Sequence, residues 1–132
     1  MGKPRAILDT NVFVGAGFNR GSASARLLRA VREGRLVMVW SAATRAETER
    51  ILRKIPPLSR EAVADLFDPA HEAPDTDPTI AEFVTDPEDR KFAALSLATG
   101  TPIVTSDDDL LSHADRLDVW KPGSFLGRYV AA

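Results

Sequence analysis

The sequence contains no cysteine, which excludes disulfide bonds, thiolate catalysis and cysteine-ligated zinc. It has no run of eighteen apolar residues, so no membrane-spanning helix is predicted. A signal peptide is not predicted either, because Asp9 and Asn11 interrupt the one apolar stretch near the N-terminus. These absences lead us to expect a cytoplasmic protein without a membrane segment.

Glycine-rich and nucleophile motifs are also missing. The chain contains no G-x-x-x-x-G-K-[ST], no G-x-G-x-x-G and no G-x-S-x-G, which argues against a P-loop, a dinucleotide-binding turn and a hydrolase serine. What is present is an ordinary globular composition, 44% apolar and 27% charged over 132 residues. We expect one domain spanning residues 1–132.

Charge is distributed unevenly along the chain. Residues 1–66 contain 12 Lys and Arg against 6 Asp and Glu, a balance of +6, whereas residues 67–132 contain 5 against 13, a balance of −8. Two solvated faces would explain this distribution. A polyanion held by arginines beside an acidic, metal-binding centre would explain it as well.

Predicted strands and helices alternate along the chain. Strands are expected at 5–8, 36–40, 102–105 and 117–120, and helices at 22–33, 42–54, 59–67, 86–98, 107–112 and 123–129. Ser22, Ser41 and Asp86 are the expected helix caps, and Pro56-Pro57 and Gly100 the expected stops. Residues 68–79 are the least regular, with a brief extended piece near 71–73. The alternation predicts a three-layer α/β/α sandwich with a mostly parallel central sheet.

Two aspartates follow predicted strands. Asp9 ends the apolar run of ILDTNV, and Asp107 follows the strand at 102–105. Because parallel sheets bind ligands at the carboxyl ends of their strands, both carboxylates would meet in one crevice if both strands are central. The alternative is that each aspartate merely caps the helix that follows it.

Two further acids lie on inward helix faces. Glu47 has Ala43 and Ile51 four residues away on either side, so a partner is needed, either an arginine or a shared metal ion. Asp89 shares a face with Phe92, although an acid at its position could also bond back to the helix cap. Three or four acids in one crevice would repel one another unless a cation compensates. All-oxygen ligands favour Mg²⁺ or Mn²⁺, and such a site suits phosphoryl chemistry.

In this order, ILDTNV, SAATRAE and DPEDRKFAALSLATGTPIVTSDDDLL make the sequence resemble the PIN-domain family of nucleases. The resemblance is strongest to VapC-like bacterial PIN proteins, the toxins of type II toxin–antitoxin pairs. It extends over nearly the whole chain, including WKPGSFLGRY, and is weakest across residues 56–80. No single motif carries it, but four acids in this order, with D-x-x-F-A-A and V-T-x-D between the matching elements, carry it together.

The resemblance implies a PIN-like fold and a metal site made by Asp9, Glu47, Asp89 and Asp107. It assigns supporting roles around the metal to Thr10, Asn11 and Asp109. The implied activity is Mg²⁺- or Mn²⁺-dependent endonucleolytic cleavage of single-stranded RNA. A cognate antitoxin and a second copy of the chain are the implied protein partners.

Candidate contacts to the RNA backbone rest on charge and position. They are Arg20, Arg26, Arg29, Arg32 and Arg35, with Arg45 and Arg50 as further candidates. A solvated helix face is the alternative for each.

Two rival functions remain at this stage. A haloacid-dehalogenase-like phosphatase also begins with a strand that ends in aspartate, but it requires a second acid where this chain has Asn11. A PIN domain with weak or no catalysis could instead serve as an RNA-binding or assembly module.

Overall fold

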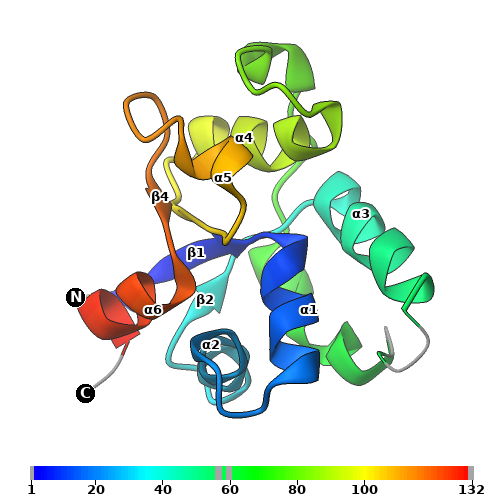
Figure 1. The fold of residues 1–132 in the computed structure, drawn as a ribbon, viewed down its shortest axis with the longest axis vertical. Helices are drawn as coiled ribbons and strands as arrows, with labels where there is room; N and C mark the ends of the chain where they lie inside the picture. The colour runs from blue at the N-terminus through cyan, green and yellow to red at the C-terminus, as the bar shows by residue number, and fades with distance from the viewer. Residues whose placement is uncertain (1, 56–57, 59–60, 131–132) are drawn as a thin grey trace.

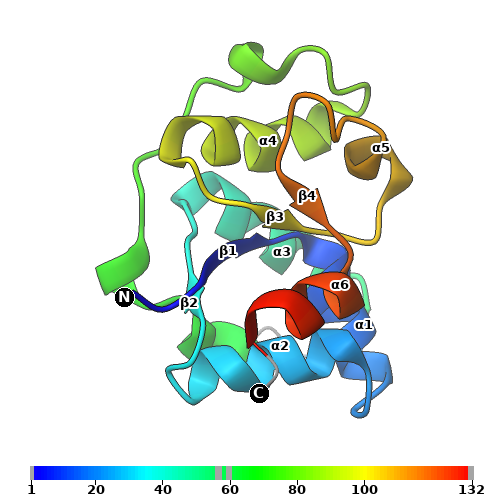
Figure 2. The ribbon, with the colours of Figure 1, turned by 90° about the vertical axis from the view of Figure 1, so that its left-hand side faces the viewer.

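A parallel sheet forms the centre of the protein (Figures 1 and 2). The computed structural model describes residues 2–55, 58 and 61–130. The strand order is β2 (Val37–Met38), β1 (Arg5–Leu8), β3 (Ile103–Val104) and β4 (Val119–Trp120), with every pair parallel. β1 and β3 are therefore the two inner strands. This arrangement meets the condition under which Asp9 and Asp107 would converge.

Helices cover both faces of the sheet, as Figure 2 shows. One face carries α1 (Thr10–Phe18), α2 (Ala23–Arg32), α6 (Pro122–Phe125) and the π-helical turn Leu126–Val130. The other face carries α4 (Pro87–Thr99) and α5 (Asp108–Leu111), with the 3₁₀ turn Pro78–Ala81 packed on α4. Helix α3 (Ala42–Arg53) contacts both α1 and α4. The predicted α/β/α sandwich is confirmed.

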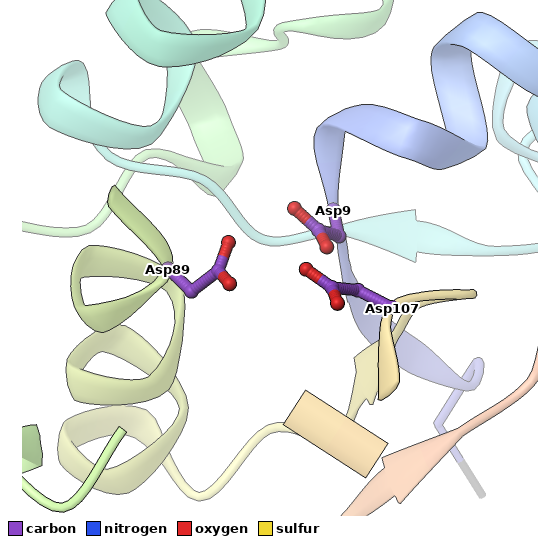
Figure 3. A group of neighbouring side chains, drawn as sticks. All are labelled: Asp9, Asp89 and Asp107. Carbon is purple, nitrogen blue, oxygen red and sulfur yellow. The ribbon is translucent and has the colours of Figure 1, made fainter. Parts of the chain in front are cut away.

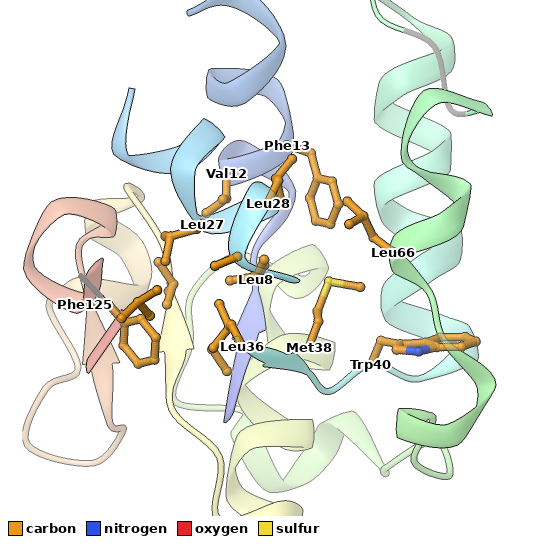
Figure 4. Close-up of a cluster of buried hydrophobic side chains, with 14 of the residues drawn as sticks. Leu8, Val12, Phe13, Leu27, Leu28, Leu36, Met38, Trp40, Leu66 and Phe125 are labelled. Carbon is orange, nitrogen blue, oxygen red and sulfur yellow. The ribbon is translucent and has the colours of Figure 1, made fainter. Parts of the chain in front are cut away.

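The core has two parts because side chains alternate along the strands. Ala6 and Leu8 of β1 face the cluster that also holds Leu27 of α2, which Figure 4 shows in close-up. Ile7 points the other way and packs with Phe92 of α4. Burial on both faces explains why β1 is a short apolar run rather than an alternating one.

Local signals place most helix ends where the sequence predicts them. The side chains of Ser22, Ser41 and Asp86 accept hydrogen bonds from the first turns of α2, α3 and α4. Gly100 ends α4 at φ 66°, a left-handed conformation that favours glycine. These residues determine where α2, α3 and α4 begin and where α4 ends.

The structure differs from the predicted elements in several places, and the strands expected at 102–105 and 117–120 are reduced to Ile103–Val104 and Val119–Trp120. Helix α1 was not predicted. The strand expected at 36–40 is reduced to Val37–Met38, with Trp40 bridging to Glu72 in the piece expected to be extended. The segment Glu61–Leu66 is 3₁₀ rather than α-helical, and the last helix continues as a π turn from Leu126. The predicted stop at Pro56-Pro57 and the predicted start at 59 lie outside the described residues.

A candidate metal centre at the carboxyl ends of the strands

Asp9 lies where β1 ends and α1 begins. It is the N-cap of α1, and its Oδ1 accepts a hydrogen bond of 2.8 Å from the backbone N–H of Thr10. Only 4% of Asp9 is exposed. From the sequence, Asp9 could either cap the following helix or belong to an acidic site. In the structure it caps α1 and also lies close to two other carboxylates, as described below.

Polar side chains from α1 and from the segment after β3 hold the second oxygen of Asp9. The hydroxyl of Thr105 donates to Asp9 Oδ2 at 2.8 Å, and the amide of Asn11 donates to the same oxygen at 3.0 Å. Thr105 Oγ1 also accepts the backbone N–H of Asp107 at 2.9 Å, and Asn11 Oδ1 accepts the N–H of Ser106 at 3.0 Å. This network ties the end of β1 to the segment after β3.

Three carboxylates converge at this edge of the sheet. Figure 3 shows the side chains of Asp9, Asp89 and Asp107 directed toward one shared space. One carboxylate oxygen from each lies within 4.8 Å of the others. Asp107 caps α5, and Asp89 lies in the first turn of α4, so each acid stands at a helix N-terminus. The positive ends of three helix dipoles offset part of the negative charge.

We call Asp9, Asp89 and Asp107 the acid group. Neighbouring protein groups offset only part of the negative charge of these three carboxylates. Asp89 is 9% exposed, and its Oδ2 is buried without a hydrogen-bond partner among the described residues. Burial, followed by the charge of Asp9 and a hydrogen bond to Asp107, raises the pKa of Asp89 to about 8. Burial also raises the pKa of Asp9, against the hydrogen bonds from Thr105 and Thr10.

Glu47 is buried on α3, as its flanking residues predict, but its carboxylate has other partners. Arg50 Nη2 lies 2.6 Å from Glu47 Oε1, and Lys91 Nζ lies 3.5 Å from Glu47 Oε2. Burial acts to raise the pKa of Glu47, but the hydrogen bond from Arg50 and the charge of Lys91 outweigh it and lower the pKa overall. Glu47 is not among the carboxylates within 4.8 Å of one another. Its role as a metal ligand stays a prediction.

The other predicted supporting residues lie close to the acid group. The Thr10 hydroxyl bonds Thr48 of α3 at 3.0 Å, which links α1 to α3. A carboxylate oxygen of the exposed Asp109 lies within 4.8 Å of oxygens of Asp86 and Asp89. Asp89 is thus shared by two groups of acids.

Comparisons with known proteins agree with this geometry. Residues 5–109 match the family model described as PIN domain. The chain belongs to the PIN-domain family. Its fold is similar to a chain of the crystal structure of VapBC2 from Rickettsia felis bound to a DNA fragment from their promoter. The TM-score is 0.60 at 15% identity, covering 89% of this chain and 98% of that chain. No curated protein matches the chain.

The predicted RNA-contacting arginines on and around α2 lie away from the acid group of this PIN domain. Arg20 follows the far end of α1, about 13 Å along the helix from Asp9. Arg29 and Arg32 of α2 line, with Arg20, a groove of about 590 Å³ whose walls include Phe13 and Leu28. Arg26 is exposed on α2. Arg32 and Arg35 pair with Asp65 and Glu33. Their contact with RNA stays a prediction.

The acid group of the PIN domain is chemically suited to a hard divalent cation. Its donors are carboxylate oxygens, and Asp89 Oδ2 is a buried oxygen that a cation would satisfy. A cation would also reverse the rise in the pKa of Asp89. Sequence reasoning missed Thr105, which is fully buried and holds Asp9. Its place in V-T-x-D, directly after a strand, is the one signal that could have indicated this role.

Among the described residues, no helix is long and apolar enough to cross a membrane.

Proposed function

We propose that this PIN domain is a Mg²⁺- or Mn²⁺-dependent endoribonuclease that cleaves single-stranded RNA and acts as the toxin of a toxin–antitoxin pair. The observation that carries the proposal is the convergence of Asp9, Asp89 and Asp107, with a buried oxygen of Asp89 that has no hydrogen-bond partner in the described part of the protein. A group of acids this close is costly without a cation. Membership of the PIN-domain family supports the nuclease assignment.

Within this proposal, Asp9, Asp89 and Asp107 hold the cation, and Glu47 is a fourth candidate ligand. When bound, the cation supplies Lewis acidity and activates a water for attack on the phosphodiester. Thr105 and Asn11 keep the Asp9 carboxylate in one orientation through their hydrogen bonds to Oδ2. Thr10 braces α1 against α3, and Asp109 adds negative charge beside Asp89.

The partner proposals rest on similarity of fold. The similar chain comes from a VapBC2 structure, which supports a cognate antitoxin as the partner of this chain. A homodimer is proposed from the resemblance of the sequence to VapC-like PIN proteins, and light scattering after size exclusion tests it. Co-expression with the product of a small adjacent reading frame, followed by co-purification, tests the antitoxin.

The activity is tested by incubating the purified protein with labelled single-stranded RNA and Mn²⁺ or Mg²⁺, with and without EDTA. The isosteric variants Asp9→Asn and Asp89→Asn are assayed beside it, and the exposed Asp115→Asn is the matched control. We expect metal-dependent cleavage that the first two variants lose and the control retains.

Three other results of this assay would contradict the proposed activity or favour another function. Equal cleavage by all variants would indicate a contaminating nuclease and refute the proposal. RNA binding without cleavage would favour the non-catalytic module. Release of phosphate from small phosphomonoesters without RNA cleavage would favour a phosphatase.

A further inference from the structure

Glu47 is the centre of an ion-pair cluster that joins two helices beside the acid group. Two guanidinium nitrogens of Arg50 bond its oxygens at 2.6 and 3.1 Å, and Lys91 Nζ lies 3.5 Å away. Lys91 also pairs with Glu88 at 3.1 Å. The carboxylate of Glu47 thereby connects α3 to α4, and two basic side chains are neutralised there.

The cations in this cluster remain accessible to a large ligand. The side chains of Arg50 and Lys91 are 44% and 27% exposed, whereas that of Glu47 is 7% exposed. Lys91 follows Asp89 of the acid group by two positions on α4. On α3, Thr48 follows Glu47 and bonds Thr10, the residue after Asp9, at 3.0 Å. The ion-pair cluster around Glu47 therefore lies beside the acid group, unlike the arginines around α2, which lie beyond the far end of α1.

A nucleic acid that approaches the acid group meets several carboxylates of like charge. Cations beside those carboxylates are needed to bind the backbone phosphates that flank a reacting one. Arg50 and Lys91 have the charge and the location for this role, but Glu47 and Glu88 occupy them. Because the side chains of Arg50 and Lys91 are partly exposed, an ion that competes for the Glu47 carboxylate can displace them.

We propose that Glu47 keeps Arg50 and Lys91 from the RNA backbone, and that a divalent ion at the acid group releases both cations from Glu47 by competing for its carboxylate, which leaves Lys91 with the exposed Glu88 alone. The inference rests on the proposed nuclease function. It adds that the metal binds before the RNA, because metal binding frees the cations that hold the RNA backbone. Lys91, which the sequence did not single out, becomes a substrate-positioning residue.

The test measures RNA binding instead of cleavage. Fluorescence anisotropy of a labelled single-stranded oligoribonucleotide is recorded in EDTA and in Mn²⁺, and a denaturing gel verifies that the RNA is intact. Glu47→Gln is compared with Glu49→Gln, a matched control on the same helix that removes one charge from the partly exposed pair with Arg45. The double variant E47Q/K91M reports whether Lys91 carries the effect, and thermal melts verify folding.

We expect Mn²⁺ to tighten RNA binding by the wild type about fivefold, the effect of releasing two weakly paired cations. E47Q should bind RNA in EDTA about as tightly as the wild type does in Mn²⁺, E49Q should not, and E47Q/K91M should lose the gain. Equal gains for E47Q and E49Q would reduce the effect to net charge and overturn the inference. If the wild type cleaves RNA and E47Q shows no gain, the inference alone fails; if the wild type neither binds nor cleaves RNA, the proposed function fails too.

Discussion

Replacing Asp89 with asparagine should remove metal binding and yet make the chelated protein more stable. The carboxylate is buried against Asp9 and Asp107, and its Oδ2 has no hydrogen-bond partner in the described part of the chain. Asparagine has nearly the same shape, carries no charge and can donate a hydrogen bond to a neighbouring carboxylate. The substitution therefore removes an electrostatic cost and leaves no cavity.

The magnitude follows from the pKa of Asp89, which is raised from 3.8 to about 8 in the folded protein. A raised pKa means that the folded state holds the proton more tightly, so stability is highest below pH 4 and falls as the pH rises toward 8. A shift of about four units corresponds to about 6 kcal/mol if Asp89 alone carries the proton. Because Asp9, whose pKa is also raised by burial, can take the proton instead, we expect about 2 kcal/mol at pH 8.

Urea unfolding at pH 5 and pH 8 in EDTA measures this difference, with Asp115→Asn as the matched control. For a chain of 132 residues, 2 kcal/mol corresponds to about 7 °C in Tm. The gain for Asp89→Asn should be small at pH 5 and largest at pH 8. Added Mn²⁺ should stabilise the wild type and the control but not Asp89→Asn, because only a protein that binds the ion gains stability from it.

The reasoning would be refuted if Asp89→Asn were no more stable than the wild type at pH 8 in EDTA. A gain of equal size at pH 5 and pH 8 would also contradict it, because such a gain could not come from the titration of Asp89. A comparable gain for Asp115→Asn would assign the effect to net charge.

Three further predictions follow from the same network. Thr105→Val should lower the free energy of unfolding by about 1–3 kcal/mol, since it removes the hydroxyl that bonds Asp9, and Thr105→Ser should restore it; urea denaturation measures both. The affinity for Mn²⁺ should fall as the pH is lowered below about 8, because the ion competes with the proton on Asp89; calorimetry in two buffers of different ionisation enthalpy should detect the released proton. Gly100→Ala should cost about 1 kcal/mol, because φ there is 66°, and thermal unfolding would contradict this if Tm were unchanged.

The sequence was sufficient for the parts of the fold and site that general geometry dictates. The strand at Arg5–Leu8 was predicted with its observed bounds. The convergence of Asp9 and Asp107 followed from parallel strands, since the carboxyl ends of two inner strands meet at one edge. Asp89 was placed correctly on the inward face of its helix.

Other features depended on contacts that local patterns do not encode. Helix α1 contains two glycines and is apolar around most of its circumference, so it shows no amphipathic period. The burial of Glu47 was predictable, but an arginine and a metal ion were equally compatible with it. Lys91, the partner that links Glu47 to α4, is 44 positions away in the sequence. Thr105 resembles any β-branched residue of a strand until its hydroxyl is seen beside Asp9.

The hydrogen bond between Asp9 and Thr105 joins residues 96 positions apart, and it has a consequence for protein synthesis. β1 is synthesised well before β3, its inner neighbour in the sheet. A nascent chain that stops before Thr105 carries Asp9 and Asp89 but lacks both the hydroxyl that orients Asp9 and the carboxylate of Asp107. Under the proposed activity, we expect such an unfinished chain to be inactive, because Asp107, the last acid of the group in the sequence, has not yet been added.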